Sequence, residues 1–177
     1  TPEVRIESTY DTDAGEFVLT VTQSCPPTPG QPEKKPYHIP LAIGLIDEHG
    51  EDLPVTLAGE DAPGPQTRVL EIREEQESFR FTDLPGRPVL SLLRNFSAPV
   101  KLSHNYSADE LMFLLAHDSD GFARWDAGQL LHLNVLQQLA DDPDARLPEG
   151  YLASMRKTLI DGNDVSTELG KLLQDIV

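Results

Sequence analysis

The chain has 177 residues, and its 14 Lys and Arg against 30 Asp and Glu give a formal net charge of −16. Such an acidic surface repels phosphate groups, so we expect neither nucleic acid nor an anionic membrane as a partner. Hydrophobic residues make up 38% and charged residues 25% of the sequence, as in folded soluble proteins. The longest apolar run, Leu111 to Ala116, is too short to cross a bilayer.

Proline content divides the chain, because 13 of the 15 prolines precede residue 100. In this first part, apolar residues alternate with polar ones, which is typical of strands with one buried face. The alternation predicts seven or eight short strands, around Val4–Tyr10, Phe17–Val21, Ile39–Leu45, Leu70–Ile72, Phe79–Phe81, Leu90–Leu92 and Val100–Leu102. Short strands separated by Gly-, Asp- and Pro-containing turns indicate an antiparallel β-sandwich. Pro40 and Pro54 require edge or bulge positions, since proline donates no ladder hydrogen bond.

The second part has the 3.6-residue period of helices. Ser107 and Glu110 form a capping-box pattern directly before the apolar run that starts at Leu111. A longer helix is predicted over Gly121–Leu139 with Asp120 as its N-cap, and a third from near Pro148 to about Asp161. A fourth is expected from near Ser166 to the last residue.

The long helix carries apolar residues on two sides, which is typical of a helix buried between layers. Phe122, Trp125, Leu133 and Leu136 share one side, and we expect Trp125 to be a core residue packed with Phe122. Four short helices are few to cover both sides. Together with the start at Thr1-Pro2, this leads us to expect a piece of a longer chain that is truncated within a helical domain. On such a piece, the predicted stripe of Leu169, Leu172, Leu173 and Ile176 would be exposed.

A search for catalytic and metal-binding patterns gives no candidate residue. None of the five histidines, at positions 38, 49, 104, 117 and 132, has a histidine partner at the spacing of a helical zinc pair. The sequence contains no H-E-x-x-H, G-x-S-x-G, G-x-G-x-x-G or P-loop motif. We therefore predict no catalytic, cofactor-binding or metal-binding residue in this chain.

Three weaker features have structural interpretations. The segment from His117 to Gly121 resembles part of a calcium loop, but the bidentate acid that such a loop needs is missing, so an interhelical turn is preferred. The acidic residues 141–144 are interpreted as a solvated loop. Cys25, the single cysteine, excludes an internal disulfide, and no lysine or histidine lies close to it in sequence to activate the thiol.

Four stretches in a consistent order closely resemble the bacterial aminopeptidase N family, which are zinc-dependent alanyl aminopeptidases. They are His38-Ile39-Pro40-Leu41-Ala42-Ile43, then Asp47-Glu48-His49-Gly50 with Leu53-Pro54, then Asn95-Phe96-Ser97-Ala98-Pro99-Val100-Lys101-Leu102, then Arg124-Trp125-Asp126-Ala127. The similarity extends over nearly the whole chain and is weakest after Asp141.

The resemblance implies a fold and a division into domains. Residues 1–103 resemble the family's immunoglobulin-like β-sandwich domain, and residues 104–177 resemble the opening helices of its helical C-terminal domain. We therefore expect an immunoglobulin-like antiparallel β-sandwich followed by a short all-α segment.

The resemblance also implies a non-catalytic role. The family binds zinc through H-E-x-x-H and a distant glutamate and holds the substrate amine through a G-A-M-E-N-type motif, none of which occurs here. No cofactor is thus expected in this chain, and zinc and peptide substrates belong to the parent enzyme. The sandwich would space the catalytic domain from the helical capping domain, so the expected partners are those missing domains of the same chain. A cytoplasmic location is expected.

Two alternatives remain open from the sequence. One is a free-standing immunoglobulin-like binding module, which a row of exposed aromatic residues on one sheet face would support. The other is an independent enzyme, which turnover by the purified chain would support.

Overall fold

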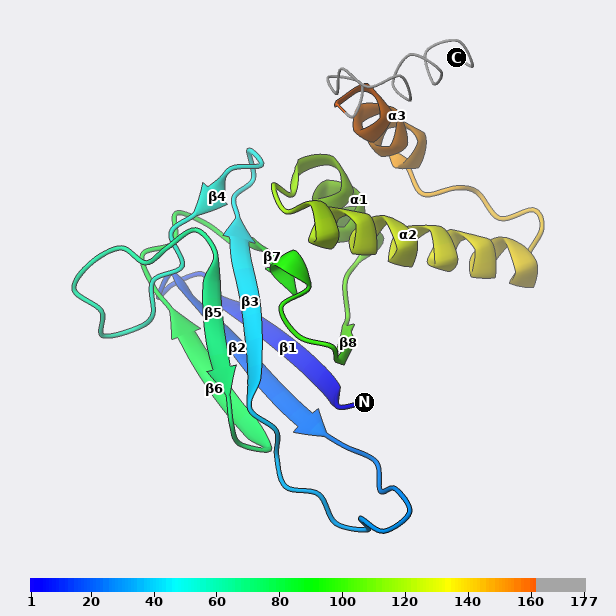
Figure 1. Cartoon of the computed structure of the whole chain (residues 1–177). Helices are drawn as coiled ribbons and strands as arrows, with labels where there is room; N and C mark the ends of the chain where they lie inside the picture. The colour runs from blue at the N-terminus through cyan, green and yellow to red at the C-terminus, as the bar shows by residue number, and fades with distance from the viewer. Residues whose placement is uncertain (162–177) are drawn as a thin grey trace, which may run out of the picture.

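The computed structural model describes residues 1–161 as two β-sheets with a group of α-helices packed at one end of them (Figure 1). One sheet has the strand order β6-β2-β1-β8, with bounds Gln76–Phe81, Glu16–Ser24, Glu3–Asp11 and Lys101–His104. In the other, β3 (Ile39–Ile46) pairs with β4 (Asp52–Leu53), β5 (Arg68–Ile72) and β7 (Val89–Leu92). The predicted sandwich is confirmed, with eight strands in this part of the chain.

The period-two pattern of the sequence corresponds to the buried faces of the strands. In β3, Ile39, Leu41, Ile43 and Leu45 are all buried in the core between the sheets. The opposite face of β3 is covered as well, since Ala42 and Ile46 are also buried. The loop that carries Arg94 lies over Gly44, and Ile46 packs in the cluster of the helices, which explains why both faces of β3 are apolar or small.

One pair of strands departs from the antiparallel expectation. β8 runs parallel to β1, in a register that places Glu3 opposite Lys101 and Ile6 opposite His104. All other pairs of named strands in residues 1–161 are antiparallel. Pro40 lies in the half of β3 that pairs only with β5, so its missing N–H leaves no ladder bond broken.

The predicted helix starts are confirmed by their caps. α1 (Ala108–His117) begins with a complete capping box, in which Ser107 Oγ accepts from the Glu110 N–H (3.1 Å) and Glu110 Oε2 accepts from the Ser107 N–H (2.8 Å). α2 (Gly121–Asp141) begins where Asp120 Oδ1 accepts from the Ala123 N–H at 2.8 Å. α3 (Tyr151–Asp161) starts three residues after Pro148. The predicted fourth helix and the stripe at residues 169–176 lie outside the described residues.

The two apolar sides of α2 have different environments. Ala127 and Leu131 are buried in the cluster that α2 shares with α1, and Ala123 is buried as well, whereas Trp125 has 58% of its surface exposed. The expectation that Trp125 is a core residue is therefore wrong. Its ring contacts Phe122, which is partly buried against the sandwich core, but the rest of that side of α2 is not covered by residues 1–161.

Two apolar clusters make up the interior, one inside the sandwich and one among the helices. Ile46, at the end of β3, is fully buried in the helical cluster. Tyr106 packs against both clusters, and its hydroxyl donates to the Leu90 carbonyl at 2.8 Å. Burial raises the pKa of this phenol well above its ordinary value, so the hydroxyl keeps the proton that it donates. The helices are thus packed directly on the sandwich.

None of the helices within residues 1–161 has the length and apolar character needed to cross a membrane.

The packing of β3 gives a direct test of the strand register. Leu41 is fully buried, so we expect Leu41→Ala to lower the free energy of unfolding by about 2–5 kcal/mol. Glu48, in the exposed turn after β3, is the control, and Glu48→Ala should change stability by less than about 0.5 kcal/mol. Thermal and urea unfolding would measure both variants. Equal losses would contradict the assigned faces of β3.

Candidate functional site

The histidines do not meet in the described part of the chain. His38 pairs with Glu71 at the surface, His104 contacts the Ile6 carbonyl, and His132 lies against Met155. His117 stacks on Phe113 and lies beside Lys157. Among the described residues, no group of three or more His, Cys, Asp or Glu side chains could hold a metal ion. The residues present therefore do not fit the zinc centre of the family that the sequence resembles.

Cys25 has neighbours that the sequence did not predict. Lys34 Nζ lies 3.6 Å from Cys25 Sγ, and the Tyr37 hydroxyl lies 3.9 Å from the same sulfur. The loop between β2 and β3 brings these groups together, so Lys34, nine residues along the chain, reaches the thiol although no lysine or histidine lies next to it in sequence. No histidine or carboxylate takes part in these contacts, so the group lacks a general base.

The calcium-like segment between α1 and α2 is an interhelical turn that is fastened to the sandwich. Asp120 caps α2 with one carboxylate oxygen and accepts from the Asn95 N–H with the other, at 3.0 Å. Asp118 is 1% exposed and accepts from Arg94 Nη2 at 3.2 Å. The two carboxylates are thus used for contacts within the protein.

Arg94 is the centre of a buried polar cluster, which we call the Arg94 clasp and define as Arg94, Asp52, Asp118, Ser91, Thr67 and Ser119. Arg94 is 1% exposed, and each of its three side-chain nitrogens donates a hydrogen bond. Nη2 and Nη1 hold the two oxygens of Asp52 at 2.6 and 3.2 Å, which is the bidentate arrangement that guanidinium groups favour. Nε donates to Ser91 Oγ at 2.9 Å, and Nη1 also donates to Thr67 Oγ1 at 3.0 Å.

The Arg94 clasp connects segments that are far apart in the sequence. Asp52 lies on β4 and Ser91 on β7, while Asp118 and Ser119 come from the turn between α1 and α2. The Ser119 hydroxyl donates to Asp52, so a second hydrogen bond joins that turn to the sandwich. The clasp therefore holds the start of the helical segment to the end of the sheet.

The surrounding backbone is shaped to admit the guanidinium. A Cβ atom at Gly44 of β3 would lie 2.1 Å from Arg94 Cζ, so only glycine fits beneath it. Leu93, Asn95 and Phe96 have φ values of 53°, 55° and 51°, in the left-handed region that costs about 1–3 kcal/mol for a residue with a side chain. Such a loop persists because the buried contacts of Arg94 compensate for that cost.

The two acids of the clasp have pKa values shifted in opposite directions. Burial opposes ionisation of Asp52, but hydrogen bonds from Arg94 and Ser119 outweigh it and lower the pKa of this carboxyl. At Asp118 burial is the larger effect and raises the pKa. Hydrogen bonds from Ser91 and the Asp120 N–H and the charge of Arg94 lower this pKa by less. Asp118 Oδ2 has no hydrogen-bond partner, which is consistent with a carboxylate that ionises reluctantly.

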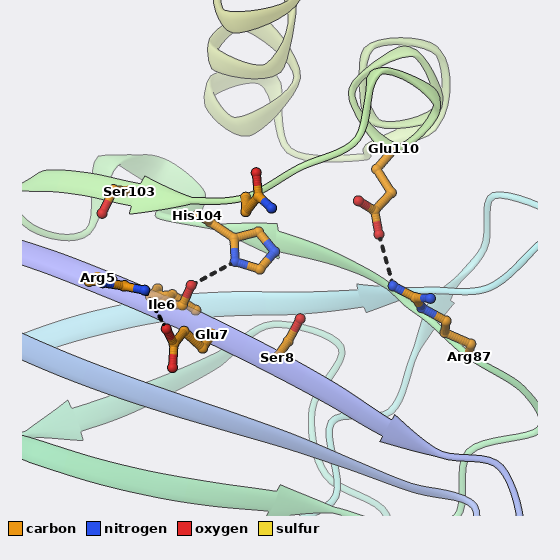
Figure 2. Close-up of a pocket in the computed structure, with 9 residues that line it drawn as sticks. Arg5, Ile6, Glu7, Ser8, Arg87, Ser103, His104 and Glu110 are labelled. Carbon is orange, nitrogen blue, oxygen red and sulfur yellow. Dashed lines mark hydrogen bonds and ion pairs between the residues drawn. The ribbon is translucent and has the colours of Figure 1, made fainter.

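A second candidate site is an open polar groove of about 500 Å³ beside β1 (Figure 2). Its lining comes from β1, from the end of β8, from the segment before β7 and from α1, namely Arg5, Ile6, Glu7, Ser8, Arg87, Ser103, His104, Asn105 and Glu110. His104 Nδ1 lies 2.9 Å from the Ile6 carbonyl, so it carries the proton and donates. Arg87 approaches Glu110 at 3.4 Å, and Arg5 pairs with Glu7 at 2.6 Å. The groove offers polar groups and no arrangement of nucleophile and base.

A third feature is an exposed apolar face, the α2 apolar surface, made of Phe96, Trp125, Leu133 and Leu136. These residues are 54%, 58%, 61% and 62% exposed. Phe96 reaches this face through the loop that carries Arg94, and its ring lies 5.0 Å from that of Phe122. Large apolar side chains exposed together on one side of a helix mark a candidate interaction surface.

Sequence reasoning missed the Arg94 clasp. Arg94 follows the mainly apolar segment Val89–Leu93. An arginine directly after a buried strand can itself be buried, and a buried arginine needs an acidic partner. The partners could not be found in this way, because Asp52 and Asp118 lie 42 and 24 residues away.

The fold and the three features define a class, an immunoglobulin-like sandwich that carries a packed helical segment. The family model described as "Domain of unknown function (DUF3458) Ig-like fold" matches residues 1–105, and the chain belongs to this family. A second model, described as "Domain of unknown function (DUF3458_C) ARM repeats", matches residues 108–173.

The chain is also similar to curated proteins named aminopeptidase N, as the resemblance predicted. It is 37% identical to that of *Escherichia coli* K12, 40% to that of *Haemophilus influenzae* and 41% to that of *Caulobacter vibrioides*. These matches cover 91%, 78% and 91% of the chain but only 18%, 15% and 18% of the relatives. The chain thus spans less than a fifth of their length.

A solved structure supports the fold. The chain superposes on *Legionella pneumophila* aminopeptidase A, in a complex with aspartic acid, with a TM-score of 0.72 at 24% identity. The match covers 90% of this chain and 17% of that one. The matched part of that protein therefore has the same arrangement of sandwich and helices.

The burial of Arg94 predicts a large loss of stability when it is removed. Arg94→Met leaves Asp52 and Asp118 without their cation, so we expect the free energy of unfolding to fall by about 3–5 kcal/mol at neutral pH. Arg80, paired with Glu16 on the surface, is the matched control, and Arg80→Met should cost less than about 1 kcal/mol. Replacing Asp52 and Asp118 by leucine in the Arg94→Met variant should recover much of the loss. Urea unfolding of the four proteins measures this, and similar losses for Arg94→Met and Arg80→Met would contradict the clasp.

The same cluster predicts a pH dependence. The pKa of Asp52 is lowered in the folded protein, so its stabilisation is present above the ordinary carboxyl pKa and is lost as the pH falls through the lowered value. In Arg94→Met that stabilisation is absent. Protonation of Asp52 and Asp118 then removes the cost of burying two carboxylates without a cation. The stability deficit of Arg94→Met should thus be smaller at about pH 3 than at about pH 7. A deficit that is constant over this range would contradict the pairing.

The α2 apolar surface predicts weak self-association of the chain. The net charge of −16 opposes association, so added salt should strengthen it by screening. Trp125→Ser with Leu133→Ser should reduce the association, whereas Asn134→Ser, at an exposed position on the other side of the same helix, should not. Sedimentation velocity at low and high salt would measure it, and a monomer of unchanged mass in both conditions would contradict the prediction.

Proposed function

We propose that the chain is a non-catalytic part of an aminopeptidase N-type enzyme, in which the sandwich spaces a catalytic domain from a helical domain. Residues 1–103 would be the sandwich, and residues 104–177 the opening helices of the helical domain. Two observations support this proposal. The matches to aminopeptidase N cover most of this chain, and they cover less than a fifth of the length of those relatives.

The Arg94 clasp is the observation that carries the spacer role. A spacer has to keep a fixed geometry between the parts that it joins, and a hinge between sandwich and helices would remove that property. Here the turn between α1 and α2 is held to β4 and to the Arg94 loop by charge-assisted hydrogen bonds, of which the one between Asp118 and Arg94 is buried. Hydrogen bonds of this kind fix direction as well as distance.

The partners in this proposal are the other domains of the same longer chain. The α2 apolar surface would be covered by further helices of the helical domain, which agrees with the ARM-repeat match, since stacked helical repeats bury such faces. Zinc, the general base and the binding of peptide substrates would belong to the catalytic domain. The location of the enzyme would be cytoplasmic.

A binding module of carbohydrate or protein has less support. The large aromatic residues exposed in residues 1–161 are Tyr37, Phe96 and Trp125, which lie in loops or on α2. They do not form a row on a sheet face.

The absence of activity in the isolated chain is the simplest test of the proposal. We expect the purified, untagged 177 residues to bind no stoichiometric zinc and to leave an alanyl arylamide uncleaved. Elemental analysis and a chromogenic assay would decide this. About one zinc per chain, or turnover that a chelator abolishes, would contradict the proposal.

A chimaera tests the spacer role itself. The matching segment of *E. coli* aminopeptidase N would be replaced by this chain, and the chimaera should retain zinc and alanyl aminopeptidase activity. The same chimaera with Arg94→Met should retain zinc but lose kcat/KM, while Arg80→Met serves as the control. Equal activity of the Arg94→Met and Arg80→Met chimaeras would contradict a role for fixed domain geometry.

A further inference from the structure

The outer edge of β1 is paired along only part of its length. β2 pairs with β1 along all nine residues, from Glu3 to Asp11, whereas β8 pairs only with Glu3–Ile6. At the end of β8, His104 Nδ1 donates to the Ile6 carbonyl, and the ring lies edge-on to Tyr106 with 4.4 Å between ring centroids. The chain then leaves the sheet and enters α1.

The register identifies which peptide groups are left free. The Lys101 N–H donates to the Pro2 carbonyl, so the carbonyl of Pro2 points toward β8. Because alternate residues of a strand direct their N–H and C=O groups to the same side, the even-numbered residues of β1 all point them toward β8. Ser8 and Tyr10 are the next even-numbered residues, and they lie beyond the end of β8. No strand within residues 1–161 pairs with this side of them. Their N–H and C=O groups therefore form a short open sheet edge.

The polar groove of about 500 Å³ reaches the start of this open edge at Ser8, and Thr9 and Tyr10 line a second open hollow farther along β1. Figure 2 shows the Ser8 side chain directed into the polar groove, with His104 on one side and the Arg87–Glu110 pair on the other. A neighbouring strand in a sheet lies about 4.8 Å away, so a groove along an open edge is the place where an added strand would run. Open edges of this kind are templates for strand addition.

Arg87 gives the groove a charge preference. Its side chain is 69% exposed, and its contact with Glu110 is long, at 3.4 Å. Glu110 is also held by the Ser107 N–H in the capping box, at 2.8 Å. Arg5, the other arginine in the lining, is already paired with Glu7 at 2.6 Å. Each arginine makes one carboxylate contact through Nη2, and the contact of Arg87 is the longer, so Arg87 is the arginine of the lining that is held more weakly by its own acid.

We propose that the open edge of β1 at Ser8–Tyr10 binds an extended peptide segment as an added strand, with an acidic side chain of that segment placed on Arg87. The main chain of the segment supplies the donors and acceptors that the edge lacks, and the carboxylate supplies the partner for the guanidinium. This binding surface goes beyond the proposed spacer role, since it lies on the sandwich and involves neither the Arg94 clasp nor the α2 apolar surface.

The experiment uses the isotope-labelled full chain and a blocked nine-residue peptide of alternating threonine and valine with one central glutamate. Titration followed by amide NMR should give saturable shifts at Ser8, Thr9, Tyr10 and Arg87. The same peptide with a central lysine should bind about five- to tenfold more weakly, as expected for the loss of one charge-assisted contact. A glutamate peptide that is N-methylated at alternate positions should not bind.

Two variants test the assigned contacts. Arg87→Gln should abolish the preference for the glutamate peptide over the lysine peptide, whereas Arg5→Gln, the matched control, should preserve it. Ser8→Pro removes an edge N–H and should weaken binding of both peptides, and the N-methylated peptide makes the same test without altering the protein.

Several results would overturn the proposal. These are the absence of saturable shifts, shifts located away from β1, or a glutamate preference that persists in Arg87→Gln. Concentration-dependent shifts of Ser8–Tyr10 without peptide would assign the edge to a second copy of the chain and would also overturn it. Each result is independent of zinc content and of the chimaera's activity, so failure here leaves the spacer proposal standing.

Discussion

A single buried arginine determines how the two parts of this protein are joined. Arg94 donates hydrogen bonds to the sheet strands and to the interhelical turn, and its charge is balanced by Asp52 and Asp118. Buried ion pairs contribute little net stability compared with apolar packing, but their geometry is strict. Here these directional contacts are added to the apolar packing of Ile46 and Tyr106 between the helices and the sandwich. The left-handed residues of the Arg94 loop and the glycine beneath the guanidinium belong to the same constraint.

The functional interpretation depends on this joint. Among the described residues no group of three or more His, Cys, Asp or Glu side chains could hold a metal ion, while the similarity to aminopeptidase N covers most of the chain. A rigid connection between an immunoglobulin-like sandwich and the first helices of a repeat array is what a spacer requires. The exposed face of α2 and the open edge of β1 lie on different parts of this unit, so the contacts proposed for them do not compete.

Most of the fold could be predicted from local patterns. Alternation located the strands, and the caps at Ser107 and Asp120 located two helix starts, since both are set by residues a few positions apart. The environment of Trp125 was predicted wrongly, because periodicity shows that two sides of α2 are apolar but not which side has a neighbour. The parallel pairing of β8 and the contacts of Arg94 depend on chain returns of tens of residues, which no local pattern encodes. The candidate sites were therefore the least predictable part.

The most direct test of the account is the relative orientation of sandwich and helices in solution. Residual dipolar couplings of backbone amides would be measured for the full chain, separately for residues in β1–β7 and in α1–α2. The account predicts that one alignment tensor fits both sets in the native protein and that Arg94→Met requires two. Two different tensors in the native protein would show that sandwich and helices move independently, and would contradict the rigid joint on which the spacer role rests.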